Sequence, residues 1–197
     1  NREVPKPLNK LLVQSMAPPA HIVVIDNGSH TIKVGHAGQD RPAVAVKHGE
    51  PHDAHGTTPV QNGRLADLDA LEAHWDHALT NHLNLDTEEC AVLTTAHLFD
   101  TKETKEKMLQ ALFESFAVPR AYIVAPEVLE LYASGRENGV VLGVGAQTTY
   151  AVLLHEGLPD PRTLVRSDVA GDALDAHLAA LFRGAGAVRD AASAREL

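Results

Sequence analysis

A short stretch near the start of the chain combines residue types that can bind phosphate. The apolar run 22–25 leads into Asp26-Asn27-Gly28-Ser29, and the apolar run that follows contains Lys33. Asn-Gly between two strand-like runs predicts a β-hairpin in which both central turn residues have positive φ. Backbone N–H groups in such turns bind anions, and the Ser29 hydroxyl, the Lys33 ammonium and an Asp26 carboxylate suited to hydrated Mg²⁺ would add to this site. An ordinary surface hairpin is also compatible with these residues.

The composition excludes several classes of function. The chain has 197 residues, enough for one domain or two small ones. Its formal net charge of −9 argues against a nucleic-acid or anionic-membrane surface, because both select for clustered Lys and Arg. The single cysteine, Cys90, excludes an internal disulfide and fits a reducing compartment. No apolar run approaches the roughly 20 residues that span a bilayer, and the sequence has no signal-peptide pattern.

Two segments with different patterns open the chain. Residues 1–20 contain four prolines and no sustained apolar period, which predicts an extended arm. From residue 21 to about residue 137, strand-like and helix-like runs alternate in the order βββαβαβα, which predicts an α/β domain. The expected strands are 22–25, 31–34, 43–46, 91–95 and 121–124. The expected helices are 67–83, capped by Asp67; one capped by Asp100 or Thr101, with Met108, Leu112, Phe113 and Phe116 facing inward; and 126–135.

A second round of elements begins after residue 138 and is incomplete at residue 197. Its expected strands are 140–144, 149–155 and 164–166, and its expected helix is 173–183. An incompletely layered α/β unit exposes apolar surface and strand edges that proteins normally cover. We therefore expect the segment from Val140 to Phe182, together with the N-terminal arm, to contact other protein subunits.

The polar segment 47–58 contains His48, His52 and His55. Their spacing matches no zinc module, and no cysteine lies nearby, so we expect no metal site there.

The motifs resemble those of a known family. Asp26-Asn27-Gly28-Ser29, followed by Lys33, Gly35 and Ala37-Gly38, resembles the first phosphate-binding hairpin of actins and actin-related proteins. The resemblance implies an actin-like (ribonuclease-H-like) fold, with an actin-like first domain at 21–137 and a partial second domain at 138–197. It also implies that about half of a full actin is absent and that 47–58 replaces a longer small lobe. It continues in order through Trp75, 92–94, 107–108, 113–116, 131–136 and 170–171.

The resemblance places a second phosphate hairpin at 139–150, and here the sequence departs from the family pattern. Actins have aspartates at the positions of Gly143 and Ala146 and a glycine at that of Gln147, so only Gly145 and Thr149 match. Without the two carboxylates, an anchor for metal-bound water is lost. With a side chain at Gln147, close approach of the backbone to phosphate is hindered.

Three further positions depart from the actin pattern. Pro126 stands where actins carry a water-positioning glutamine, His30 replaces a glycine, and Tyr150 replaces a histidine. Phosphoryl transfer needs positioning and charge neutralisation that one remaining hairpin does not supply. We therefore expect no catalytic residue, no metal site and no resident cofactor, with Mg-ATP binding as the alternative. The vestigial phosphate-hairpin residues are Asp26, Gly28, Ser29, Lys33, Gly145 and Thr149.

These residues predict a non-catalytic, scaffolding actin-related subunit of a large cytoskeletal assembly, axonemal or dynactin-like. Such a subunit would act through protein contacts in the cytoplasm. Asp26 and Lys33, which the chain retains, leave a second interpretation: an ATP-binding actin-like protein whose second half is unseen. A third is an actin-related subunit of a nuclear chromatin-remodelling complex. A sugar kinase would need a catalytic aspartate that the sequence does not offer.

Overall fold

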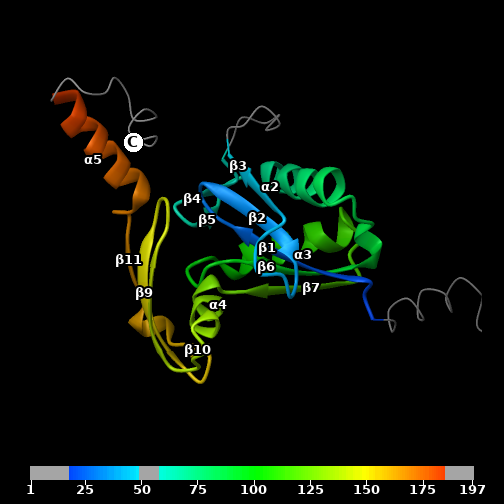
Figure 1. Cartoon of the computed structure of the whole chain (residues 1–197). Helices are drawn as coiled ribbons and strands as arrows, with labels where there is room; N and C mark the ends of the chain where they lie inside the picture. The colour runs from blue at the N-terminus through cyan, green and yellow to red at the C-terminus, as the bar shows by residue number, and fades with distance from the viewer. Residues whose placement is uncertain (1–17, 49–57, 185–197) are drawn as a thin grey trace, which may run out of the picture.

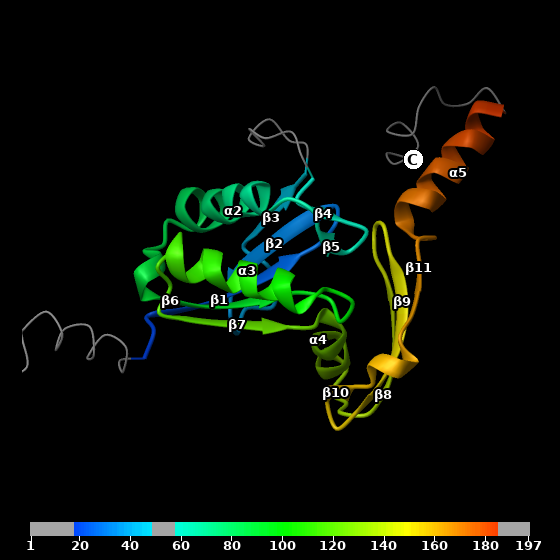
Figure 2. The same cartoon turned by 180° about the vertical axis from the view of Figure 1, so that it is seen from behind.

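The computed structural model of the chain describes residues 18–48 and 58–184 (Figure 1). Most of the arm expected at 1–20, and His52 and His55 of the polar segment, lie outside the described residues. The described part contains a five-stranded sheet with helices, followed by a smaller sheet from which the last helix extends (Figures 1 and 2). In the described part, no helix combines the length and the apolar character needed to cross a bilayer.

The first sheet has the strand order β3-β2-β1-β6-β7. Strands β1, β2 and β3 pair antiparallel, whereas β6 lies parallel to β1 and β7 parallel to β6. This is the expected βββαβαβα order, with one addition, the short hairpin formed by β4 and β5. The bounds are β1 His21–Asn27, β2 Thr31–His36, β3 Val44–Lys47, β4 Val60–Gln61, β5 Arg64–Leu65, α2 Leu68–Asp76, η1 His77–His82, η2 Thr87–Glu89, β6 Cys90–Thr95, α3 Lys102–Glu114, β7 Arg120–Val124 and α4 Pro126–Ala133.

One face of the first sheet forms the main core. Alternate residues of β1, Val23 and Ile25, are fully buried, and they pack with Leu71 and Trp75 of α2 and Leu112 of α3. Val23 and Ile25 lie on one face of β1, and residues of both helices pack in the same cluster with them. Both helices therefore cover the same side of the sheet. The 3.6-residue helical period produces this apolar stripe, and the expected caps form: Asp67 accepts from the Ala70 N–H and Thr101 from the Thr104 N–H.

Phe113 of α3 does not face inward as expected. Its side chain is 46% exposed, whereas Met108, Leu112 and Phe116 are buried. Phe113 follows Leu112 directly and therefore lies about 100° further round the helix, away from the sheet. Met108 and Leu112 therefore lie on the inward face of α3 as expected, Phe116 is buried just beyond the end of the helix, and the prediction for Phe113 is wrong.

The hairpin between β1 and β2 forms, but its turn differs from the expectation. Asn27 is the last residue of β1 and pairs with Ile32, so Gly28, Ser29 and His30 make the connection. Neither Asn27 nor Gly28 is among the described residues with positive φ. The reason is the Asn27 side chain, which is buried and hydrogen-bonded and keeps this residue in the strand. Gly28 still needs to be glycine, because a Cβ there would lie 2.7 Å from the Thr31 carbonyl oxygen.

A second Asn-Gly pair forms the turn that the first does not. Asn62 and Gly63 connect β4 to β5 with φ values of 49° and 68°. Positive φ at both central residues is the feature of a type I′ hairpin turn, for which Asn-Gly is the preferred sequence. The sequence analysis did not identify this turn, although its signal is the same.

The second sheet is built around β9. Strand β8 pairs with one edge of β9, and β10 and β11 pair with the other. One face packs against α4 through a cluster that contains Leu131, Val152 and Leu154. Residues on the other face of β8 stay exposed: Val140 is 69%, Leu142 67% and Val144 62% exposed. The bounds are β8 Gly139–Val144, β9 Thr149–His155, β10 Leu158–Pro159, η3 Pro161–Thr163, β11 Val165–Ser167 and α5 Gly171–Gly184.

Replacing Asn27 by alanine should weaken the first sheet. Trp75 Nε1 donates to Asn27 Oδ1 at 3.0 Å, and Asn27 Nδ2 donates to Thr94 Oγ1 at 2.8 Å and to the Thr95 carbonyl at 2.9 Å. Asn27→Ala leaves these buried groups without a partner, so we expect the free energy of unfolding to fall by about 2–3 kcal/mol. Urea titration followed by the fluorescence of the single Trp75 measures it. Thr80→Ala, which removes an exposed hydrogen bond to Asp76, is the control and should cost under about 0.5 kcal/mol. Equal losses in the two variants would contradict the role of Asn27.

Candidate functional site

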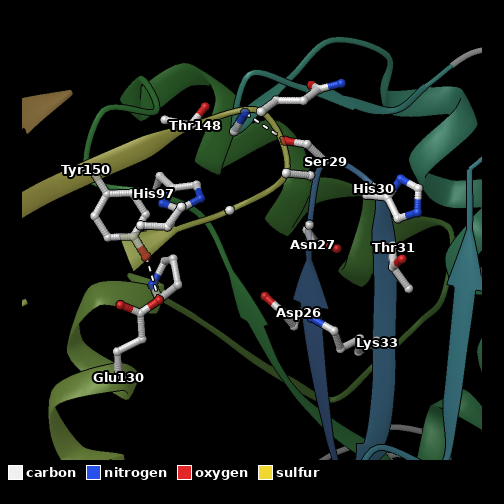
Figure 3. A pocket seen from close by; sticks show the side chains of 17 residues that line it. Asp26, Asn27, Ser29, His30, Thr31, Lys33, His97, Glu130, Thr148 and Tyr150 are labelled. Carbon is white, nitrogen blue, oxygen red and sulfur yellow. Dashed lines mark hydrogen bonds and ion pairs between the residues drawn. The ribbon is translucent and has the colours of Figure 1, made fainter. Parts of the chain in front are cut away.

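The two expected phosphate hairpins face each other across a cavity of about 320 Å³. Figure 3 shows this cavity, with Asp26, Ser29 and Lys33 of the first hairpin opposite Tyr150 of the second. Thr149 does not line the cavity, and its hydroxyl donates to the Val169 carbonyl at 2.7 Å. The cavity therefore brings together five of the six expected site residues: Asp26, Gly28, Ser29, Lys33 and Gly145.

The carboxylate of the first hairpin is already engaged. Asp26 and Lys33 are cross-strand partners, and Lys33 Nζ lies 3.0 Å from Asp26 Oδ2. The other oxygen, Oδ1, accepts a hydrogen bond from Thr95 Oγ1 at 3.3 Å. Both charged groups are partly exposed, so this ion pair adds little stability. It does, however, offset the negative charge that would attract a hydrated cation.

The Asn62–Gly63 turn reaches both hairpins. The Gly63 N–H donates to Ser29 Oγ at 2.9 Å, and the Asn62 N–H donates to Gln147 Oε1 at 2.8 Å. Successive N–H groups in a turn can bind an anion. Here the chain's own side chains accept from both N–H groups, so these donors are occupied without a phosphate.

The second hairpin is fixed by backbone contacts at its tip. Gly145 N–H donates to the Thr148 carbonyl at 2.9 Å and closes the turn. The start of α5 donates to the same turn, from Gly171 N–H to the Gly145 carbonyl at 3.0 Å and from Asp172 N–H to the Ala146 carbonyl at 2.7 Å. Carbonyl groups at this tip therefore accept hydrogen bonds from within the chain.

Tyr150 occupies the wall of the cavity on the side of the second hairpin. Its side chain is 5% exposed, and its hydroxyl donates to Glu130 Oε1 of α4 at 2.6 Å (Figure 3). Burial raises the pKa of the Tyr150 phenol well above its ordinary value, and the hydrogen bond to the Glu130 carboxylate raises it further. The phenol is therefore neutral throughout the physiological pH range.

A buried carboxylate near the cavity was missed by the sequence analysis. Glu127 is fully buried, and its Oε1 lies 3.0 Å from His97 Nδ1, while its Oε2 has no hydrogen-bond partner. His97 lines the cavity, stacks on Phe99 at 4.6 Å between ring centroids and makes a T-shaped contact with Tyr150 at 5.2 Å between centroids. One signal was present: Glu127 stands four residues before Leu131, on the inward face of α4. Its partner, thirty positions earlier in the chain, could not be read from the sequence.

His48 contributes to the fold beneath the first hairpin. Its Nε2 lies 2.9 Å from the Gly28 carbonyl oxygen and its Nδ1 3.3 Å from His74 Nε2. Within residues 18–48 and 58–184, no three His, Cys, Asp or Glu side chains are grouped so that they could hold a metal.

The sequence model of the family described as Actin matches residues 47–190. The chain belongs to the actin family. Three similar relatives are proteins named Actin-like protein 9. The chain is 34% identical to the Rattus norvegicus protein over 182 residues, covering 80% of this chain and 44% of that protein. It is 32% identical to the Bos taurus protein over 225 residues (93% and 54%) and 32% identical to the Mus musculus protein over 196 residues (87% and 47%).

The actin assignment confirms the resemblance and the fold class expected from the sequence. The chain spans about half the length of these curated relatives. Its cleft lies between two hairpins, as expected for an actin, but no carboxylate of the second hairpin lines it.

Replacing Tyr150 by phenylalanine should change how stability depends on alkaline pH. Because the folded state raises the phenol's pKa, the unfolded chain releases this proton first as pH rises above about 10. The contribution of the neutral phenol to the free energy of unfolding is present below that pH and is lost above it, by up to about 1.4 kcal/mol per pH unit. Tyr150→Phe has no proton to release at this position, so the stability of the variant should fall less steeply between pH 9.5 and 11.

Urea unfolding at a series of pH values measures the two slopes. Tyr122→Phe, which removes an exposed phenol, is the matched control and should keep the wild-type slope. Parallel curves for wild type and Tyr150→Phe would contradict the burial of the Tyr150 hydroxyl.

Proposed function

We propose that this actin-family chain is a non-catalytic, structural subunit of a larger protein assembly. The observation that carries the proposal is the second hairpin, which contributes Val144 to Thr148 and Tyr150 to the cavity and no carboxylate. Phosphoryl transfer depends on metal ions held by fixed ligands and on a positioned nucleophile. Pro126, which lines the same cavity, has no polar side chain that could orient a water.

The polar groups that remain in the cleft support the same proposal. Asp26 is paired with Lys33, Ser29 accepts from Gly63, and Gln147 accepts from Asn62. Each of these groups would have to break a protein contact before it could bind a phosphate or a metal-bound water. Nucleotide binding would therefore start with an energetic cost that an open phosphate site does not have.

The exposed face of the second sheet supports a role in protein contacts. Leu142 and Val165 both pair with Ala151, so the three share one face across β8, β9 and β11. Val140 and Leu153 extend this face, and all four large residues among the five are exposed. Exposed contiguous apolar surface of this kind usually marks an interaction site. We place these contacts in a cytoskeletal assembly, axonemal or dynactin-like, in the cytoplasm, with the N-terminal arm as a second contact.

Two other functions are alternatives to this proposal. The 320 Å³ cavity, with Asp26, Ser29 and Lys33 in its wall, favours an ATP-binding actin-like protein as the second candidate. A nuclear chromatin-remodelling subunit would use the same exposed faces, and the identity of the copurifying chains separates it from a cytoskeletal subunit.

Titration of the whole chain with Mg-ATP tests the loss of nucleotide binding. Calorimetry with up to 1 mM Mg-ATP is expected to show no binding, because the second hairpin has no metal anchor. Lys33→Ala is the control variant and should give the same flat trace. Binding with a Kd near 10 µM in the wild type that is lost in Lys33→Ala would establish the ATP-binding alternative.

Charged substitutions on the exposed sheet face test the structural role. In extracts of cells that express the tagged chain, the wild type should elute from a size-exclusion column within a large complex. Leu142→Glu combined with Val165→Glu should elute as the free chain, because a buried unpaired carboxylate opposes docking. Lys102→Glu, an exposed position on α3, is the control and should elute as the wild type does. A complex unaffected by the double substitution would contradict docking through this face.

A further inference from the structure

Gly143 and Tyr150 lie directly opposite each other on β8 and β9. The Tyr150 ring crosses over the backbone of Gly143 on the buried face of the sheet. A Cβ atom on residue 143 would lie 2.5 Å from the Tyr150 hydroxyl oxygen, 2.6 Å from Cε2 and closer still to Cζ. Real Cβ atoms essentially never approach heavy atoms this closely, so a side chain at 143 and this ring position exclude each other.

Contacts on three sides hold the ring in this position. Its hydroxyl donates to Glu130 at 2.6 Å, and its ring makes a T-shaped contact with His97 at 5.2 Å between centroids. The ring also belongs to the apolar cluster of the second sheet, which includes Val152. Moving the ring aside would cost the hydrogen bond and part of this packing.

Another glycine of the same strand shows that the restriction is local. A Cβ on Gly139 would lie 3.3 Å from Leu131 Cδ1, the mobile end of a flexible side chain. That contact can be relieved by a small shift of Leu131, whereas the contact at Gly143 involves the far end of a ring that is fixed at its hydroxyl.

We propose that Tyr150 is an internal plug of the cleft, which occupies the space that a carboxylate at position 143 would need. The inference rests on the proposed loss of nucleotide function and deepens it. Because Gly143 leaves the space that the Tyr150 ring fills, Gly143→Asp alone would not place a carboxylate in the cleft. The second hairpin thus lacks a metal-anchoring side chain at position 143, and the Tyr150 ring also occupies the space that such a side chain would need.

A double-mutant cycle on the whole chain tests the plug. Gly143→Ala should raise the unfolding equilibrium constant by about 10- to 100-fold, because it overpacks a fixed ring. Gly139→Ala, the matched control in the same strand, should change it by less than about threefold. Leucine has no atom beyond Cδ, so in the Tyr150→Leu background Gly143→Ala should also change the constant by less than about threefold.

Gly143→Asp provides a second measurement if Gly143→Ala fails to fold. The aspartate variant should unfold cooperatively in the Tyr150→Leu background and be strongly destabilised or unfolded beside Tyr150. The proposal is overturned if Gly143→Ala behaves like Gly139→Ala, or if Tyr150→Leu gives no relief of either substitution at 143. These readouts need no nucleotide, so their failure is distinct from Mg-ATP binding by the wild type, which would overturn the proposed function.

Discussion

The buried amide of Asn27 is the constraint on which the first sheet depends. The Asn27 side chain accepts from Trp75 Nε1 of α2 and donates to Thr94 and Thr95 of β6. The backbone N–H of Asn27 donates to Thr95 Oγ1. A buried amide with these partners is stable only in one position, because each lost bond would leave a desolvated polar group. This requirement keeps Asn27 in the strand, limits the connection to residues 28–30 and places Asp26 on the opposite side of β1 from the core.

The cleft next to Asn27 has an arrangement in which potential ligand-binding groups bond to one another. The Asn62–Gly63 turn donates to Ser29 and Gln147, and Tyr150 donates to Glu130. A phosphate or a hydrated cation would have to compete with these contacts. The two actin-type hairpins thus form, and polar groups on both of them are hydrogen-bonded within the chain.

Aromatic and charged side chains join the two sheets. Phe99 stacks with His97, and the guanidinium groups of Arg166 and Arg64 lie 4.7 and 5.7 Å from its ring centroid. Cation–π contacts of this kind gain strength when they are partly desolvated. They connect the loop after β6 with β5 and with β11, so the positions of the two hairpins across the cleft depend on this junction.

The sequence by itself determined the order of elements, the helical stripes, the capping residue Asp67 and the two hairpins, because each depends on neighbours within a few positions. It left Asp100 and Thr101 as alternative caps of α3, and the structure selects Thr101. Through the resemblance to actins, the sequence also predicted five of the residues that line the cavity: Asp26, Gly28, Ser29, Lys33 and Gly145. Tertiary structure alone decided that Asn27 stays in β1, that Phe113 faces outward, that Glu127 meets His97 and that Tyr150 excludes a side chain at Gly143. Most of these outcomes follow from contacts between groups far apart in the chain, and local propensity contains no information about which distant group a buried side chain will meet.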